Sequence, residues 1–155
     1  MKKILVFSMM AYDDISNMIL ESIILYQDYS YKNDSTTLFS EKNDFYAYFD
    51  DMPPNLPKQL LSNVVAISNY SLYDKGSFKL YKNGFKQRLK KRNILVSVGY
   101  SLNGNVFKVV LMPRSYVFKY KRVKLGCVST HFVCYFKYDS CVGKWILMET
   151  LSTGI

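Results

Sequence analysis

The sequence has no long apolar run, no paired set of cysteines and few acidic residues in its second half. No run approaches the roughly 20 apolar residues of a membrane-spanning helix, so we expect no membrane span. The three cysteines, Cys127, Cys134 and Cys141, are odd in number and spaced by seven residues. This spacing matches neither a disulfide framework nor a zinc signature such as CxxC, and no motif indicates a cofactor. We therefore predict no metal site and no cofactor.

The shortage of acidic residues divides the chain into halves of opposite charge. Residues 1–74 contain 5 Lys/Arg and 10 Asp/Glu, which gives a balance of −5. Residues 75–155 contain 16 Lys/Arg and only 2 Asp/Glu, a balance of +14. Such a break is typical of an electropositive face or tail, or of two segments with different origins.

The residues that are present can support a folded core. Hydrophobic residues make up 49% of the chain and aromatic residues 16%, which excludes a disordered or collagen-like segment. The length of 155 residues suits one domain. Lys2-Lys3 followed by Ile4–Ala11 is similar to the charged and apolar regions of a signal peptide. We therefore expect an extracellular protein if this run acts as a signal, and a cytoplasmic one otherwise.

The first segment, residues 1–44, is predicted to contain a helix and a polar loop. Ile4–Phe7 is a short apolar run that indicates a buried strand. Asp13 or Asp14 can then cap a helix, and residues 28–44 are rich in Asn, Asp, Ser and Thr, which indicates a loop. The helix is predicted from apolar residues at three- and four-residue spacing, namely Ile15, Met18, Ile19, Ile23 and Tyr26.

The second segment, residues 45–104, has the pattern of βα units. Strands are predicted at Phe45–Phe49, Val64–Ile67 and Ile94–Val98, with a short basic helix over Gly84–Arg92 before the last of them. Alternation of strand, helix and strand with short joints favours a parallel sheet. Three prolines between Asp50 and Pro57 exclude regular structure there, and Leu56–Leu61 is predicted to form one or two helical turns.

The third segment, residues 105–155, is predicted to be a basic, β-prone tail of uncertain fold. It contains runs of strand-prone residues without helical spacing. These runs are Val106–Met112, Tyr116–Tyr120, Val123–Val128, His131–Tyr138 and Lys144–Met148.

Residues 45–104 resemble the glycoside hydrolase family 18 chitinases and chitinase-like proteins. Ile94–Tyr100 is similar to the Ser-x-Gly-Gly strand of that family, with Ser97 and Gly99 matching and Tyr100 in place of the second glycine. Four further stretches resemble the first strand, the second strand, a following turn and the helix before the third strand. These are Phe45–Asp51, Leu60–Ser68, Gly76–Leu80 and Phe85–Asn93.

This resemblance implies an α/β fold that is an incomplete fragment of a (β/α)8 barrel, because a closed barrel needs roughly 250 residues. The family's catalytic Asp-x-x-Asp-x-Asp-x-Glu strand is absent. Beyond Asp74 the only carboxylates are Asp139 and Glu149. We therefore predict a truncated chitinase-like protein with no catalytic residues, which binds chitin or a chito-oligosaccharide weakly. The resemblance implies the carbohydrate-binding residues Tyr48, Phe49, Ser97, Gly99 and Tyr100.

A frame shift in the coding sequence would account for the change of net charge, and of the pattern of apolar residues, in the second half of the chain. Read from the third base of the Lys144 codon, the codons of Lys144–Ile155 permit a sequence close to the family's catalytic strand. We hypothesise that residues 105–155 are out of frame with the family. Coding DNA with stops in that frame would refute this.

A small basic nucleic-acid-binding module that uses residues 79–124 is the alternative function. Cations interleaved with aromatic residues can neutralise phosphates and stack on bases. No recognised nucleic-acid motif accompanies them. The cationic residues of this hypothesis are Lys86, Arg88, Lys90, Lys91, Arg92, Arg114 and Arg122.

Overall fold

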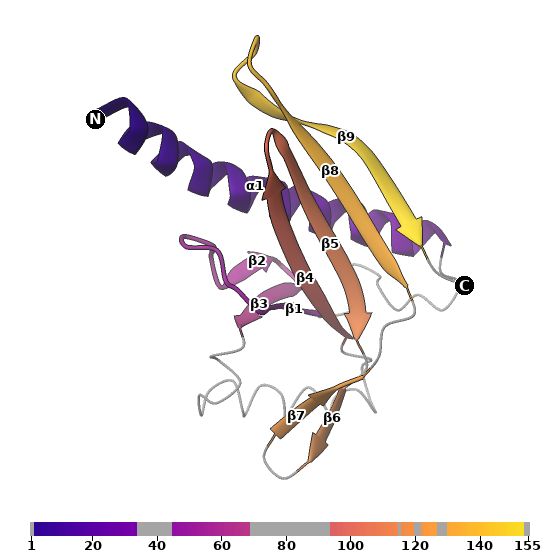
Figure 1. The fold of residues 1–155 in the computed structure, drawn as a ribbon. Helices are drawn as coiled ribbons and strands as arrows, with labels where there is room; N and C mark the ends of the chain where they lie inside the picture. The colour runs from indigo at the N-terminus through magenta and orange to yellow at the C-terminus, as the bar shows by residue number, and fades with distance from the viewer. Residues whose placement is uncertain are drawn as a thin grey trace.

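The computed structural model describes residues 2–33, 45–68, 94–114, 116–119, 122–126 and 130–153. Within these ranges the chain forms one helix and nine strands. Seven strands make one mixed sheet, and the helix runs across one face of it (Figure 1). The other two strands, β6 and β7, form a separate hairpin. The elements are α1 Lys2–Asn33, β1 Phe45–Phe49, β2 Gln59–Leu61, β3 Val64–Ser68, β4 Ile94–Asn103, β5 Val106–Arg114, β6 Tyr116–Lys119, β7 Arg122–Leu125, β8 His131–Asp139 and β9 Lys144–Thr153.

The helix α1 is longer than the sequence pattern predicted. The strand predicted at Ile4–Phe7 is wrong, and so is the first part of the loop predicted over 28–44, because both belong to α1. A short apolar run has no periodicity that separates a strand from a helix. No proline or glycine occurs before Pro53, so nothing in the sequence interrupts the helix. Over 32 residues it is about 48 Å long.

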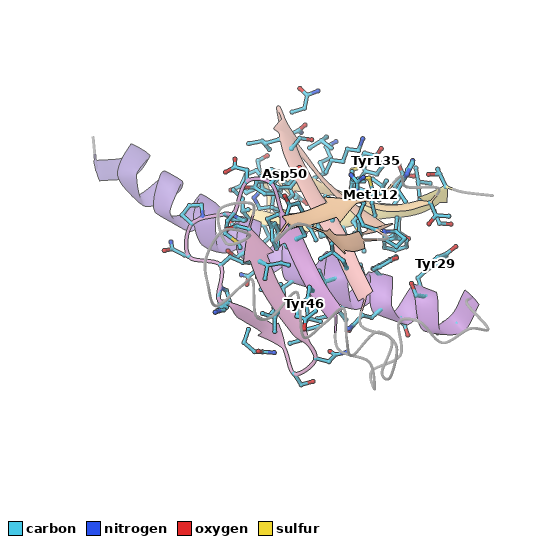
Figure 2. The ribbon with its side chains drawn as sticks, turned by 90° about the horizontal axis from the view of Figure 1, so that it is seen from below. Tyr29, Tyr46, Asp50, Met112 and Tyr135 are labelled. Carbon is cyan, nitrogen blue, oxygen red and sulfur yellow. The ribbon has the colours of Figure 1, made fainter. Side chains whose placement is uncertain are left out.

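The predicted inner face of α1 is confirmed by burial. Met18, Ile19, Ile23 and Tyr26 are all buried against the sheet. The ring centroid of Tyr26 lies 5.5 Å from that of Phe132 on β8. Near the C-terminal end of the helix, the Tyr29 hydroxyl donates a hydrogen bond of 2.8 Å to Ser152 Oγ on β9 (Figure 2). The helix is therefore fixed to strands from the far end of the chain.

The strand order of the main sheet is β2-β3-β1-β4-β5-β8-β9. β1 runs parallel to both β3 and β4, whereas the other neighbouring strands are antiparallel. The predicted fragment of a (β/α)8 barrel is therefore wrong. In such a barrel consecutive strands are neighbours, which would place Val64–Ser68 between Phe45–Phe49 and Ile94–Val98. Here β1 occupies the middle position.

Three of the strands predicted beyond residue 105 belong to the main sheet, and the two predicted at Tyr116–Tyr120 and Val123–Val128 correspond to the separate hairpin of β6 and β7. β5, β8 and β9 extend the sheet beyond β4 as an antiparallel meander. In β5 buried and half-buried residues alternate, as expected for a strand with one face toward a core. The strand predictions for Val106–Met112, His131–Tyr138 and Lys144–Met148 are confirmed.

The core lies between α1 and the facing side of the sheet. β1 contributes Ala47 and Phe49, and β5 contributes Phe107, Val109 and Leu111. The same side of β8 carries Phe132, Cys134 and Phe136. Two-residue alternation places the neighbouring side chains on the opposite face.

The remaining sequence predictions have mixed outcomes. Leu56–Leu61 was predicted to be helical, but β2 pairs there antiparallel to β3. The strand predicted to end before Gly99 continues to Asn103. The helix predicted over Gly84–Arg92 lies outside the described residues. In the part of the chain that the structure describes, no helix combines the length and apolarity needed to cross a bilayer.

Candidate functional site

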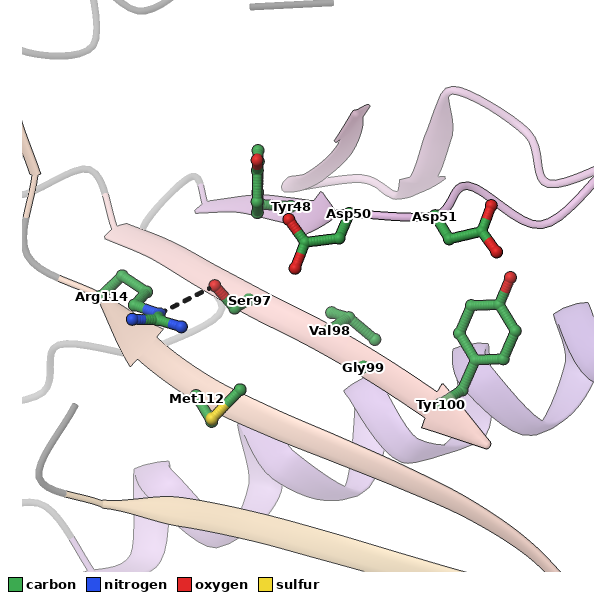
Figure 3. Close-up of a pocket in the computed structure, with 9 residues that line it drawn as sticks. All are labelled: Tyr48, Asp50, Asp51, Ser97, Val98, Gly99, Tyr100, Met112 and Arg114. Carbon is green, nitrogen blue, oxygen red and sulfur yellow. Dashed lines mark hydrogen bonds between the residues drawn. The ribbon is translucent and has the colours of Figure 1, made fainter. Parts of the chain in front are cut away.

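A surface depression of about 190 Å³ lies at the carboxyl end of β1. β1 pairs with β4 only as far as Tyr48 and Ser97, whereas β4 continues to Asn103. The chain therefore leaves the sheet after β1, and the part of β4 beyond Ser97 is not paired with β1. Side chains from β4 and β5 complete the depression (Figure 3). Its lining residues are Tyr48, Asp50, Asp51, Ser97, Val98, Gly99, Tyr100, Met112 and Arg114.

The strand order explains why a depression forms at this edge. β1 is flanked by β3 on one side and by β4 on the other, so the next two strands of the chain that run parallel to β1 lie on opposite sides of it. Crevices at the carboxyl ends of parallel strands, where the strand order reverses, are the usual ligand sites of open α/β sheets. The parallel part of this sheet has that arrangement.

Two carboxylates lie on the β1 side of the depression. Asp50 and Asp51 directly follow the last residue of β1, and both are exposed to solvent. The Asp50 carboxylate points toward Ser97 on β4, and the Asp51 carboxylate lies near the Tyr100 hydroxyl (Figure 3). Tyr48, the last residue of β1 on this side of the sheet, is buried beside them. This side of the depression is therefore negatively charged.

A guanidinium group is fixed at the opposite end. Arg114, at the end of β5, donates a hydrogen bond of 3.1 Å from Nε to Ser97 Oγ and another of 3.1 Å from Nη1 to the carbonyl oxygen of Gly126. Ser97 is only 7% exposed. These two bonds hold the guanidinium plane in one orientation, because Arg donors form a rigid fork.

Tyr100 forms the end of the depression farthest from Arg114. Its side chain points toward Asp51 (Figure 3), and its ring centroid lies 6.0 Å from that of Phe107. Partial burial raises the pKa of Tyr100, and the negative charge of Asp51 raises it further. The hydroxyl is therefore protonated at neutral pH and can donate or accept a hydrogen bond.

The structure brings together four of the five residues that the sequence resemblance assigned to carbohydrate binding. Tyr48, Ser97, Gly99 and Tyr100 all line the depression. The fifth, Phe49, is fully buried in the core. Phe49 lies with Ala47 on the side of β1 that faces the core, whereas Tyr48, between them in the strand, points to the other face.

Sequence reasoning missed four further lining residues: Asp50, Asp51, Val98 and Met112. Asp50 and Asp51 were noted only as part of the stretch that resembles a family strand, although an acidic pair directly after a buried strand was a usable signal. Met112 had no signal in the sequence that would have pointed to it.

Of the seven cationic residues of the nucleic-acid hypothesis, only Arg114 and Arg122 lie within the described ranges. Arg114 lies in the depression, and Arg122 belongs to β7. Lys86, Arg88, Lys90, Lys91 and Arg92 lie outside the residues described. Among the described side chains, no three His, Cys, Asp or Glu groups are close enough to hold a metal ion.

Comparisons of the chain with family models, with curated proteins and with solved structures find no match. The depression itself is therefore the feature from which function is inferred.

Proposed function

We propose that the depression binds one sugar unit of a short oligosaccharide without hydrolysing it. The observation that carries this proposal is the convergence of hydroxyl, carboxylate and guanidinium groups beside an aromatic ring in a single depression. At about 190 Å³ the depression is smaller than the roughly 300–1,000 Å³ of pockets for drug-sized ligands. It suits a single ring-sized group.

The lining groups match the hydrogen-bonding needs of a sugar ring. Each sugar hydroxyl both donates and accepts hydrogen bonds. Asp50 and Asp51 are acceptors, Arg114 is a donor, and the hydroxyl of Tyr100 can act as either. The ring of Tyr100 adds an apolar surface against which a sugar face can pack. Chito-oligosaccharides are the first ligands to test, because residues 45–104 resemble strands and turns of chitinase-like proteins.

Binding without hydrolysis follows from the surroundings of the two carboxylates. Glycosidic cleavage uses a carboxylic acid that protonates the leaving oxygen, and such an acid is normally kept protonated by an apolar environment. Asp50 and Asp51 are adjacent in the chain and both are exposed to water. Neither therefore has the environment of a general acid.

No specific observation favours the nucleic-acid alternative. Of its cationic residues, Arg114 is bonded to Ser97 and Gly126 within a depression that also holds two carboxylates. Those carboxylates would repel a phosphate backbone. Nucleic-acid binding stays a prediction that a binding assay at two salt concentrations can test.

A titration with a short N-acetylated chito-oligosaccharide, followed by calorimetry or NMR, tests the proposal. Because the depression is small and open, we expect a dissociation constant of about 1 mM, which corresponds to roughly 4 kcal/mol of binding free energy. Tyr100→Ala should weaken binding about tenfold or more. Tyr138→Ala is the matched control, since Tyr138 is a half-buried tyrosine on β8 that packs on Trp145 away from the depression.

Two results would contradict the proposal. The first is an absence of binding at ligand concentrations well above the expected constant. The second is the release of shorter sugars during incubation with the purified protein, which would show hydrolysis.

A further inference from the structure

We infer that the depression prefers an oligosaccharide with free amino groups, made of glucosamine units, to the N-acetylated form of the same length. This inference rests on the proposed function and adds the chemical class of the ligand. It follows from how charge is distributed along the depression: two carboxylates on one side and one guanidinium at the far end.

The positive end of the depression is already engaged by the protein. Arg114 directs Nε to Ser97 and Nη1 to the carbonyl oxygen of Gly126, each at 3.1 Å. Ser97 is buried on β4, and Gly126 follows β7, so the guanidinium is held from two elements. Its charge is therefore fixed at the end of the depression that lies farthest from Tyr100. Within the described residues no ion pair joins either aspartate to a cation.

The negative side is open to a ligand. Asp50 and Asp51 are exposed; the Asp51 carboxylate lies near the Tyr100 hydroxyl, and the Asp50 carboxylate points toward Ser97 (Figure 3). Partial burial raises the pKa of Tyr100, and the charge of Asp51 raises it further. A cationic group placed between Asp51 and Tyr100 would meet a carboxylate acceptor and the face or hydroxyl of an aromatic ring, with the second negative charge, that of Asp50, on the same side of the depression.

The ammonium group of a glucosamine unit fits this side of the depression better than an acetamide. An ammonium donates three hydrogen bonds, and its bonds to carboxylates are charge-assisted and about twice as strong as neutral ones. An acetamide is neutral, donates one hydrogen bond and takes up more of the roughly 190 Å³.

The net charge of the whole chain opposes the binding of a cationic ligand. The chain carries a formal net charge of +9, which on its own would repel a ligand with several ammonium groups. A preference for the cationic form would therefore have to arise locally, at Asp50 and Asp51, and could not come from long-range attraction.

The experiment compares a glucosamine oligosaccharide with its N-acetylated counterpart of equal length by titration at low and high salt. We expect the glucosamine form to bind about three- to tenfold more tightly at low salt, with the ratio falling as salt is added. In the double variant Asp50→Asn/Asp51→Asn the ratio should fall to about one. Glu149→Gln removes an exposed carboxylate on β9 outside the depression and should leave the ratio unchanged.

The outcomes separate this inference from the function on which it rests. If neither sugar binds, both the proposed function and the inference are overturned. If both sugars bind with equal affinity, or if the preference persists in the double variant, the inference is overturned and oligosaccharide binding stands. Both aspartates are exposed, so circular dichroism should show the double variant to be folded.

Discussion

Ser97 is the residue through which the core and the depression are connected. Its side chain is buried on β4, and its oxygen accepts the hydrogen bond from Arg114 Nε. Arg114 lies on the neighbouring strand, where its Cα pairs with that of Leu95. A small hydroxyl residue at this position therefore fixes a long cationic side chain that would otherwise have many conformations.

Replacing Ser97 should reduce stability by a moderate amount. In Ser97→Ala the guanidinium loses a partner in a partly buried setting, which should cost about 1–2 kcal/mol in the free energy of unfolding. Denaturation with urea measures this value. Ser101→Ala is the matched control, because Ser101 lies on the same strand and is exposed. Equal stability of the two variants would contradict a structural role for the Ser97–Arg114 bond.

We expect the protein to lose stability in alkaline solution, because the thiol of Cys134 is buried. Burial raises the pKa of Cys134 to about 11, the Ser22 hydroxyl that bonds to it lowers the pKa slightly, and the charge of Glu21 raises it. In the unfolded chain the thiol ionises near its ordinary value of 9.0. Between pH 9 and pH 11 the folded state therefore keeps a proton that the unfolded state has lost. The contribution of Cys134 to the free energy of unfolding is complete below pH 9 and disappears as the pH rises toward 11.

The free energy of unfolding measured between pH 8 and pH 11 tests this expectation. Cys134→Ala should show a smaller decrease over that range than the unmodified protein. Cys141→Ala is the control, since Cys141 is exposed in the turn between β8 and β9. An identical slope for all three proteins would show that Cys134 ionises as readily in the fold as outside it.

At the scale of single elements, α1 offers two adjacent isoleucines with opposite surroundings. Ile23 is completely buried against the sheet, whereas Ile24 is 48% exposed. Ile23→Ala should lower the free energy of unfolding by about 2–5 kcal/mol, because it leaves a cavity in a packed core. Ile24→Ala should change it by roughly 0.5 kcal/mol or less. Chemical denaturation of both variants measures the difference.

A similar loss in both variants would mean that α1 does not pack on the sheet through the face described. The comparison is informative because both changes are the same in chemistry and in helix propensity. Only the surroundings of the side chain differ.

The positions of most strands could be predicted from the sequence, although β2 was predicted to be helical, and the order of the strands could not be predicted. Short runs such as Val64–Ser68 and Ile94–Val98 have the β-branched composition of buried strands, and alternation is clear in β5. These are local signals. The insertion of β1 between β3 and β4 depends on pairing between residues far apart in the chain, and a resemblance based on consecutive motifs predicts consecutive neighbours instead.

The candidate site was predictable to a similar extent. Tyr48 and Ser97 were identified because both lie in strands that resemble a known family. Arg114 was assigned to a different hypothesis, since nothing in its local sequence places it beside Ser97. Only the antiparallel pairing of β4 with β5 brings its side chain to Ser97. A functional set assembled by long-range pairing leaves no spacing pattern in the sequence.

For the molecule as a whole, β9 is the edge that most exposes apolar surface. It is the last strand of the sheet, and it carries Ile146, Met148 and Leu151 as exposed large hydrophobic residues. An irregularity in its pairing lies opposite Tyr135 and Phe136. Edge strands with exposed apolar side chains favour association with other chains, although a bulge reduces this tendency.

We expect concentration-dependent association that depends on this edge. Ile146→Thr/Leu151→Thr should reduce light scattering at high protein concentration without changing the circular dichroism spectrum. Leu102→Thr is the control, because Leu102 is 59% exposed but lies at the end of β4, away from β9. Equal scattering by the parent protein and the double variant would show that β9 is not the surface involved.

The contacts between α1 and strands far along the chain also affect how the protein folds during synthesis. α1 packs on β5 and β8, and Tyr29 bonds to Ser152, so α1 finds all of these partners only after more than 100 further residues have been made. β1 likewise waits for residues 94–98 before both of its neighbours exist. During synthesis at about 5–20 residues per second, α1 therefore spends several seconds without these contacts.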